Sequence, residues 1–199
     1  MERLVKSLFV SAVMIFTLVL TGCDDASDDS DDKGNDGIEY DSREWTIENK
    51  EVKNYLGYAT NVVIPDGVTS IGAGVFNGFI RLETVTIPES VKNIGAGAFS
   101  YCVSLKTIEF PEGTENIEAG AFASCTSLES VTIPKSMKSI KFWAFRYCTE
   151  IKTVQYGGTK DDWNKIENSS YLLFVKEVIG SNGESIAGGY DQIDGKVEE

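Results

Sequence analysis

The sequence predicts a β-rich repeat solenoid, because several columns of residues recur at one fixed interval. All four prolines are separated by 23 residues: Pro65, Pro88, Pro111 and Pro134. The same interval separates four isoleucines: Ile71, Ile94, Ile117 and Ile140. It also separates four phenylalanines: Phe76, Phe99, Phe122 and Phe145. A 20–29-residue period of apolar positions is typical of solenoids of the leucine-rich-repeat type. We therefore predict a leucine-rich-repeat stack of four repeats over residues 62–153, with a cap at each end.

Each repeat contains signals for two short extended segments and a tight turn. In the second repeat, Val85 and Ile87 alternate as in a strand that points them inward, and Pro88 then ends the strand. Ile94 marks a second extended segment. The small residues of 95–98 form the turn that inserts Phe99 into the coil. We expect the strands to stack in parallel, about 4.8 Å apart, so that each coil buries the apolar face of its neighbour.

The flanking segments have the character of caps. Residues 38–61 contain short alternating apolar runs and predict a hairpin-like cover for the first coil. Residues 154–183 predict the C-terminal cap, in which Trp163 and Ile166 share one helical face and seal the last coil. Residues 184–199 are polar, and we expect them to fray at the end of the chain.

The N-terminus has the pattern of a secretory leader. Residues 1–6 carry Arg3 and Lys6, and residues 8–20 are almost wholly apolar. The run ends in Leu-Thr-Gly-Cys at residues 20–23, which resembles a bacterial lipobox. This resemblance implies that residues 1–22 are removed and that Cys23 carries fatty-acyl chains such as palmitate. The alternative is a plain signal peptide followed by an incidental cysteine.

Residues 23–37 then form a strongly acidic segment. From Asp24 to Gly37 there are seven Asp and one Lys, a net charge of −6 without a large apolar side chain, which predicts an extended tether. The Ser-Asp-Asp triplets at 27–29 and 30–32 resemble an acidic export signal that sends lipoproteins to the cell surface. Asp24 resembles instead an inner-membrane retention signal. We prefer the surface, and hence an outer-membrane anchor in the cell envelope.

Composition excludes several classes of chemistry. The chain has no histidine, so neither a histidine-dependent hydrolase nor a zinc site with imidazole ligands is available. The net charge of −13 argues against nucleic acid as a partner. Glutamates 112, 115 and 118 predict a solvated outer surface, and no phosphate loop or nucleophile motif is present. We therefore expect no enzymatic activity, no cofactor and no metal.

Three cysteines occupy one column of the repeats: Cys102, Cys125 and Cys148. The first repeat has Phe79 in this column, which indicates an apolar and packed position. We predict buried free thiols, because cysteine is among the most buried residue types and a straight stack does not converge on a metal.

The columns IPxSVxxIGxGAFxxC and LxxVTIP resemble the BspA-type leucine-rich repeats of surface lipoproteins from gut and oral anaerobes and some protozoa. The GTKxxWNxI stretch at 158–166 resembles the cap that often follows such repeats. The resemblance implies a displayed protein that adheres to host matrix proteins, other bacteria or host receptors. The fourth repeat departs from the pattern, because Lys141, Phe142 and Trp143 replace Gly95, Ala96 and Gly97 of the second.

Two surfaces are candidates for binding. The first is the strand face, whose outward residues form two rows: Thr84, Thr107, Ser130 and Thr153, and beside them Thr86, Glu109, Thr132 and Gln155. Such residues also serve simply as good strand formers. The second is an aromatic cluster near repeat four: Phe142 and Trp143, with Tyr101 and Tyr147 in one column. Exposed aromatic residues anchor partners, whereas a Trp143 packed under the C-terminal cap is purely structural.

Three functions follow as hypotheses. The first is an envelope-anchored module that binds a host matrix protein or bacterial surface protein through the strand face and an adjoining aromatic edge. The second is a carbohydrate-binding lipoprotein, which needs an exposed aromatic platform at Trp143. The third is a structural envelope protein without a soluble ligand. Exposure of Phe142 and Trp143 discriminates among them, while the ligand and the oligomeric state are left open by the sequence.

Overall fold

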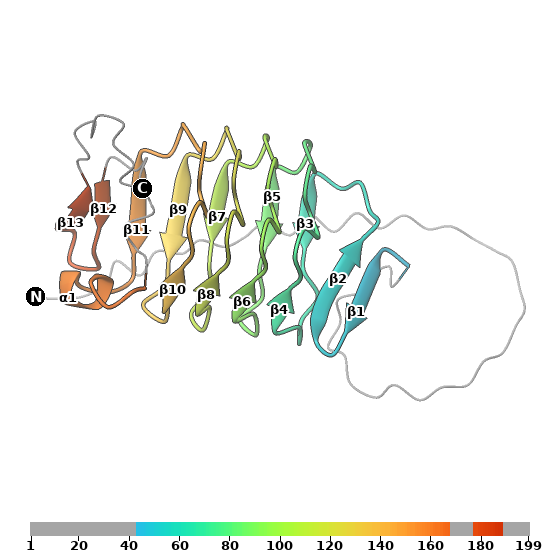
Figure 1. The fold of residues 1–199 in the computed structure, drawn as a ribbon, viewed down its shortest axis with the longest axis horizontal. Coiled ribbons are helices and arrows are strands. Elements are labelled where there is room, and N and C mark those ends of the chain that lie inside the picture. Colours follow the sequence, from blue (N-terminus) through green and yellow to red (C-terminus); the bar gives the residue numbers. More distant parts are fainter. Residues whose placement is uncertain (1–42, 168–176, 189–199) are drawn as a thin grey trace, which may run out of the picture. The chain divides into compact units, whose positions relative to one another are not determined.

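The structure is a computed structural model, and it describes residues 43–167 and 177–188. The predicted leader (1–22), the predicted lipidation site Cys23 and the acidic tether (23–37) lie outside these residues, as do 38–42 and 189–199. The described part forms a β-solenoid in which consecutive coils are 23 residues apart (Figure 1). The predicted fold class is therefore confirmed.

The first of the two strand ladders contains the strands that were predicted before each proline. It comprises β3 (Asn61–Val63), β5 (Thr84–Thr86), β7 (Thr107–Glu109), β9 (Ser130–Ile133) and β11 (Thr153–Tyr156). β3 pairs with β5, and β7, β9 and β11 pair in order, all in parallel and without a register shift. The fifth strand, β11, begins at the last residue of the four predicted repeats and continues into the predicted cap, so the ladder extends beyond those repeats.

The second ladder carries the isoleucine column. It comprises β4 (Ser70–Ile71), β6 (Asn93–Ile94), β8 (Asn116–Ile117) and β10 (Ser139–Ile140), which pair in parallel. The hairpin of β1 (Trp45–Glu48) and β2 (Glu51–Tyr55) closes its N-terminal end, because β2 pairs with β4. Trp45 of this hairpin meets Phe76 edge-on at 6.1 Å between ring centroids, and Tyr55 packs against the same ring at 5.4 Å with the planes tilted by 46°. The predicted hairpin-like cover is thus observed.

The C-terminal end is closed by a short helix and two strands. Helix α1 (Lys160–Trp163) buries Trp163, and Ile166 after it is also buried, as predicted. β12 (Glu177–Ile179) pairs in parallel with β11, and β13 (Ser185–Gly188) pairs antiparallel with β12. Residues 185–188, in the segment expected to be a polar tail, instead form β13, which pairs with β12 and buries Ile186.

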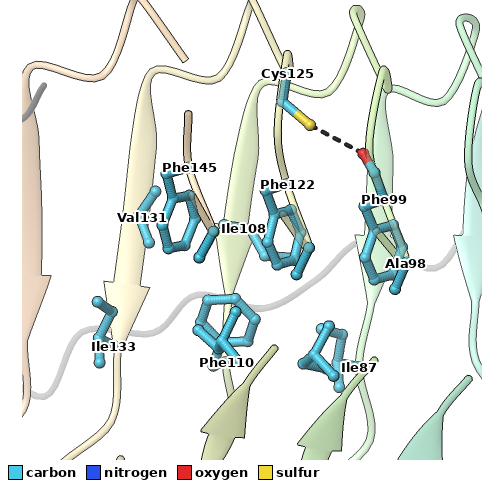
Figure 2. Close-up of a cluster of buried hydrophobic side chains, with 14 of the residues drawn as sticks. Ile87, Ala98, Phe99, Ile108, Phe110, Phe122, Cys125, Val131, Ile133 and Phe145 are labelled. Atoms are coloured by element: carbon cyan, nitrogen blue, oxygen red, sulfur yellow. Dashed lines mark hydrogen bonds between the residues drawn. The ribbon is translucent and has the colours of Figure 1, made fainter. Parts of the chain in front are cut away.

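The core is a column of stacked phenylalanine rings between the two ladders. Consecutive rings of Phe76, Phe99, Phe122 and Phe145 lie 4.9, 5.0 and 5.3 Å apart and within 8° of parallel. Phe110, which follows β7, meets Phe122 edge-on at 5.5 Å (Figure 2). The spacing of the rings follows the strand spacing, so the aromatic column is in register with the backbone ladders.

The three thiols of the cysteine column are free and fully buried. Cys102, Cys125 and Cys148 donate Sγ–H to the carbonyl oxygens of Phe76, Phe99 and Phe122, at 3.2, 3.1 and 3.0 Å. Figure 2 shows the contact of Cys125. Burial raises the pKa of Cys102 to about 12, and the neighbouring Cys148 thiol, together with burial, raises that of Cys125. The predicted column of buried thiols is confirmed.

We expect these three thiols to resist alkylation in the native protein, because the thiolate is both scarce and covered. Native protein treated with iodoacetamide near neutral pH should take up label at these positions only after a denaturant is added. Mass spectrometry of tryptic peptides measures the labelling at each residue. Fast modification of all three without denaturant would contradict the buried column.

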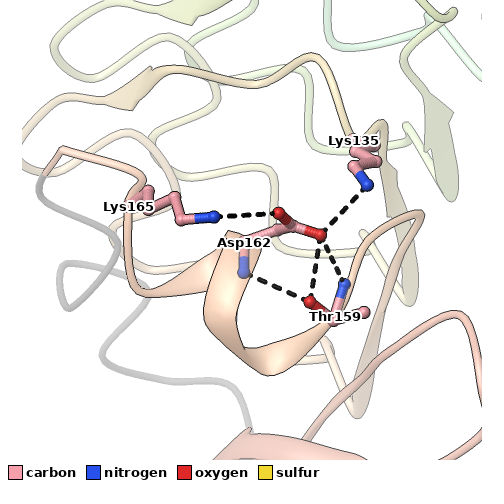
Figure 3. A network of polar contacts seen from close by, with 4 residues as sticks. All are labelled: Lys135, Thr159, Asp162 and Lys165. Carbon is pink, nitrogen blue, oxygen red and sulfur yellow. Dashed lines mark hydrogen bonds and ion pairs between the residues drawn. The ribbon is translucent and has the colours of Figure 1, made fainter.

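The C-terminal cap is fixed by one carboxylate that serves several donors. Asp162 Oδ2 accepts from the backbone N–H of Thr159 at 3.2 Å and from Lys135 Nζ at 3.2 Å, while Lys165 Nζ lies 3.3 Å from Oδ1 (Figure 3). The Asp162 N–H in turn donates to Thr159 Oγ1, which completes a capping box at the start of α1. The Thr159 N–H, followed by Lys135, holds the pKa of Asp162 well below its usual value of 3.8.

This low pKa predicts an acid-sensitive cap. Because the folded-state pKa is depressed, the stabilisation by Asp162 is complete above about pH 4 and is lost as the pH falls towards the folded-state pKa. We expect Asp162→Asn to lower the denaturant midpoint at neutral pH, and the gap from wild type to narrow in acid. Unfolding followed by Trp fluorescence from about pH 6 down to about pH 2 measures it. A gap that stays constant over this range would contradict the assignment.

Candidate functional site: the strand face and the aromatic edge

The strand face is formed by the outward side chains of the first ladder. Pairing of β7, β9 and β11 places Thr107, Ser130 and Thr153 in one row and Glu109, Thr132 and Gln155 in the next. These side chains are exposed or half-buried, while Ile108, Val131 and Val154 between them point into the core. The two predicted rows are therefore present, as flat and polar stripes across these three coils.

Thr84 and Thr86 are separated from these rows by a break in the ladder. Both lie on β5, which is paired with β3, whereas β7 belongs to the five-stranded sheet. A cavity of about 220 Å³ opens at this break, lined by Val85, Thr86, Ile87, Glu89, Glu109 and Pro111. Thr86 and Glu109 are thus the two predicted residues that share a concavity.

The aromatic side chains near repeat four are exposed. Phe142, Trp143 and Tyr147 have exposed fractions of 48, 54 and 51 %, and Tyr101 two coils away has 57 %. Of the two possibilities that the sequence leaves for Trp143, packing under the C-terminal cap is wrong. The tryptophan that seals the cap is Trp163, which is 4 % exposed and meets Tyr156 edge-on at 5.1 Å.

Trp143 is held in a strained backbone conformation. Its φ is +62°, and the equivalent residues of the three preceding coils are Gly74, Gly97 and Gly120, also at positive φ. A left-handed backbone costs a residue with a Cβ about 1–2 kcal/mol, and for a bulky side chain it is a true outlier. The column of glycines at the equivalent positions indicates this conformation in the sequence. It marks a left-handed turn, in which a side chain points out of the coil.

Arg146 organises the same cluster. Its guanidinium carbon lies 4.7 Å from the centroid of the Trp143 ring and 4.6 Å from that of Tyr147, and Nη2 donates to the Tyr147 hydroxyl at 2.7 Å. Phe142 meets Trp143 edge-on at 5.1 Å. We call Phe142, Trp143, Arg146 and Tyr147 the aromatic edge. Sequence reasoning missed Arg146, because no motif marks a cation between two rings.

The core separates the aromatic edge from the strand face. The inward residue of the same turn, Phe145, stacks on Phe122, and Phe122 meets Phe110 at the end of β7. The turn and the strands therefore contact each other through their inward side chains, and their outward side chains point to different sides of the coil. The expectation that the aromatic edge adjoins the strand face is corrected by this geometry.

A second concavity lies at the N-terminal end of the solenoid. Its volume is about 370 Å³, and it is lined by Tyr55–Ala59 and by Gly78–Leu82. Leu56, Tyr58 and Ile80, all largely exposed, contribute apolar walls. Residues 55–59 belong to the predicted N-terminal cap and residues 78–82 to the first predicted repeat, and no cavity is predicted between them from the sequence.

Within residues 43–167 and 177–188, no group of three or more Cys, Asp or Glu side chains is arranged to hold a metal ion. Glu115 pairs with Lys138 at 2.7 Å, and this hydrogen bond lowers the pKa of the carboxyl. The same part of the chain contains no helix with the length and hydrophobicity required to cross a bilayer.

Comparison with known proteins identifies the repeats. The family model described as BspA type leucine rich repeat region matches six copies over residues 46–172. A leucine-rich repeat protein of Treponema pallidum is 27 % identical, with 59 % of this chain and 71 % of that chain covered and a TM-score of 0.50. One from Bacteroides capillosus is 32 % identical, with 57 and 93 % covered and a TM-score of 0.51.

A leucine-rich repeat protein of Bacteroides ovatus is also similar, at 28 % identity and a TM-score of 0.50, with 68 % of this chain covered. The match spans only 34 % of that protein. No curated protein matches the chain. The matched range includes the β1–β2 hairpin and part of the predicted C-terminal cap. The family model covers more than half of the sequence, and the chain therefore belongs to the BspA type leucine-rich-repeat family.

Proposed function

We propose that this protein is a lipid-anchored module of the cell envelope, displayed on the outer surface, that binds a macromolecule of a host or of another bacterium. Repeats of the leucine-rich type generally act as interaction modules rather than enzymes. The observation that carries the proposal is the exposed aromatic edge, which keeps Trp143 at a positive φ where three other coils have glycine. Strained residues with no packing role are a mark of functional sites.

The anchor is proposed from the lipobox-like residues 20–23 and the acidic segment that follows. Cys23→Ser should abolish incorporation of labelled fatty acid and release the protein from the membrane fraction. Stable attachment needs more than one acyl chain, so partial release of the wild-type protein itself would indicate a single chain. Protease shaving of intact cells then decides between the outer surface and an internal face of the envelope.

Binding is tested with the full-length protein in detergent against matrix proteins, mucins and whole bacteria. Residues 38–199 have 15 basic and 23 acidic side chains, a net charge of −8, so surfaces outside the basic coil of residues 134–156 should prefer neutral or basic partners. Thr132→Ala and Thr107→Ala probe the strand face without changing the core. Absence of binding to every partner would instead favour a structural role in the envelope.

A further inference from the structure

We infer that the aromatic edge is a binding site for an acidic glycan, in which a sugar ring stacks on exposed aromatic rings and its carboxylate pairs with Arg146. This inference rests on the proposed function and names the ligand class for one of its two surfaces. The edge comprises Phe142, Trp143, Arg146 and Tyr147, with Tyr101 further along the same ridge.

The side chains of the aromatic edge are not needed for folding. In the third coil, the positions equivalent to the four residues of the edge are occupied by Ala119, Gly120, Ala123 and Ser124. That coil stacks equally well, because Ser124 donates its backbone N–H to the Arg146 carbonyl at 2.7 Å and Gly120 donates to Phe142. The fold therefore needs only small residues here, and the large side chains of the fourth coil require another explanation.

The coil that carries the aromatic edge has an excess of positive charge. Residues 134–156 carry five basic residues and one acidic residue, a net charge of +4, whereas the preceding coil, residues 111–133, carries four acidic residues and no basic one. Three of the five cations are neutralised by ion pairs, since Lys135, Lys138 and Lys141 contact Asp162, Glu115 and Glu167. No carboxylate of the described residues pairs with Arg146, so the guanidinium that lies between two rings is available to an anion.

The geometry of the Arg146 guanidinium favours a carboxylate as the bound anion. A guanidinium is a planar fork that matches a carboxylate with two parallel hydrogen bonds, and here stacking on Trp143 and Tyr147 restricts its orientation before any ligand arrives. Its hydrogen bond to the Tyr147 hydroxyl uses one of the five donors. The remaining N–H groups can donate two parallel hydrogen bonds to a carboxylate without displacing the guanidinium from the rings.

The shape of the edge favours a sugar over an acidic peptide. The two cavities described above are lined by other residues, and the edge presents rings that are about half exposed. A pyranose ring buries its C–H face on such a surface, as aromatic platforms allow. Tyr101 and Tyr147 are in one column two coils apart, a separation of about 10 Å, with small Ser124 between them. An extended polymer of sugar rings can therefore contact both.

The experiment uses the full-length chain in detergent and measures affinity by biolayer interferometry. Four probes are compared: a polyuronate, the same polymer with its carboxyls reduced to alcohols, a sulfated glycan and poly-glutamate. We expect the polyuronate to bind best, more weakly at high salt, and the reduced polymer to bind at least about 10-fold less well. If the reduced polymer bound as tightly as the polyuronate, the proposed pairing of Arg146 with a carboxylate would be wrong. If poly-glutamate bound more tightly than the polyuronate, the assignment of a glycan as the ligand would be wrong.

The variants copy residues that other coils already hold, so the fold tolerates them. Trp143→Gly, Arg146→Ala and Tyr147→Ser should each reduce polyuronate affinity by about 30-fold, the size of a hot-spot truncation. Arg146→Lys should recover little of the affinity that Arg146→Ala loses, because an ammonium group neither stacks on the rings nor forms a bidentate pair with a carboxylate. Thr132→Ala on the strand face is the matched control and should leave this affinity unchanged.

Two further outcomes are informative. Trp143→Gly should unfold at the same temperature as the wild type or higher, since it removes a strained backbone, and a lower midpoint would assign Trp143 a structural role and contradict the inference. A failure of all glycans, with binding to matrix proteins or whole bacteria intact, would overturn the inference alone. A failure of every partner would overturn the proposed function as well.

Discussion

Phe122→Ala should destabilise the protein by about 3–5 kcal/mol, the largest effect that we expect from a single core substitution. Phe122 is fully buried, stacks on Phe99 at 5.0 Å and on Phe145 at 5.3 Å, and meets Phe110 edge-on at 5.5 Å. Truncation leaves a ring-sized void in the middle of the column, and the flanking rings are held apart by the strand ladders, so they cannot close it. Urea unfolding followed by circular dichroism measures the loss.

Phe142→Ala is the matched control for this prediction. It removes the same side chain from the same solenoid, at a position where the three preceding coils have alanine and where the ring is about half exposed. We expect a change below about 0.5 kcal/mol, as for ordinary surface substitutions. If Phe122→Ala proved as mild as Phe142→Ala, the stacked column would not be a major source of stability.

Trp163→Ala should be nearly as damaging, at about 3–5 kcal/mol, because it opens the C-terminal end of the core. Trp163 is almost completely buried and packs edge-on against Tyr156 of β11. Terminal repeats of a solenoid must cover the apolar face of the last coil, so loss of this ring exposes the interior to water. Hydrogen exchange should show early loss of protection in β11 while β4 and β6 stay protected.

The second tryptophan provides the comparison. Trp143→Gly removes an indole of the same size from an exposed ridge, so it should leave both the unfolding midpoint and the exchange of β11 close to those of the wild type. Uniform loss of protection across all coils in Trp163→Ala would indicate that the solenoid unfolds as one unit. Protection of β11 that is unchanged in that variant would contradict the sealing role.

The period of the solenoid can be predicted from the sequence because equivalent residues have the same buried neighbours in every coil. Phe76, Phe99, Phe122 and Phe145 repeat because each ring stacks on the previous one, and the strand rows follow from the same register. The buried cysteines are predictable for the same reason, since Phe79 shows that their column is apolar. Sequence alone accounts for these elements because their environment is periodic.

The remaining features depend on contacts that break the period. β13 has one large apolar residue, Ile186, and is held as a strand by pairing with β12 and by burial of that side chain. Exposure of Trp143 follows from a left-handed turn that only the glycines of the other coils disclose, and Arg146 acquires its place from the two rings beside it. The separation of β5 from β7 has no counterpart in the residue columns, and nothing in the structure explains it.

The outward turn has a consequence for how such a protein diverges after its coils are duplicated. A Cβ added at Gly74 or Gly78 would meet no atom within 4 Å, so a new side chain there adds the strain of a left-handed backbone but needs no compensating change in the interior. Selection can therefore hold the duplicated interior constant while it rewrites the ridge, one point substitution at a time. The fourth coil differs from its neighbours in this way, and ligand preference in solenoids of this kind can change faster than their architecture.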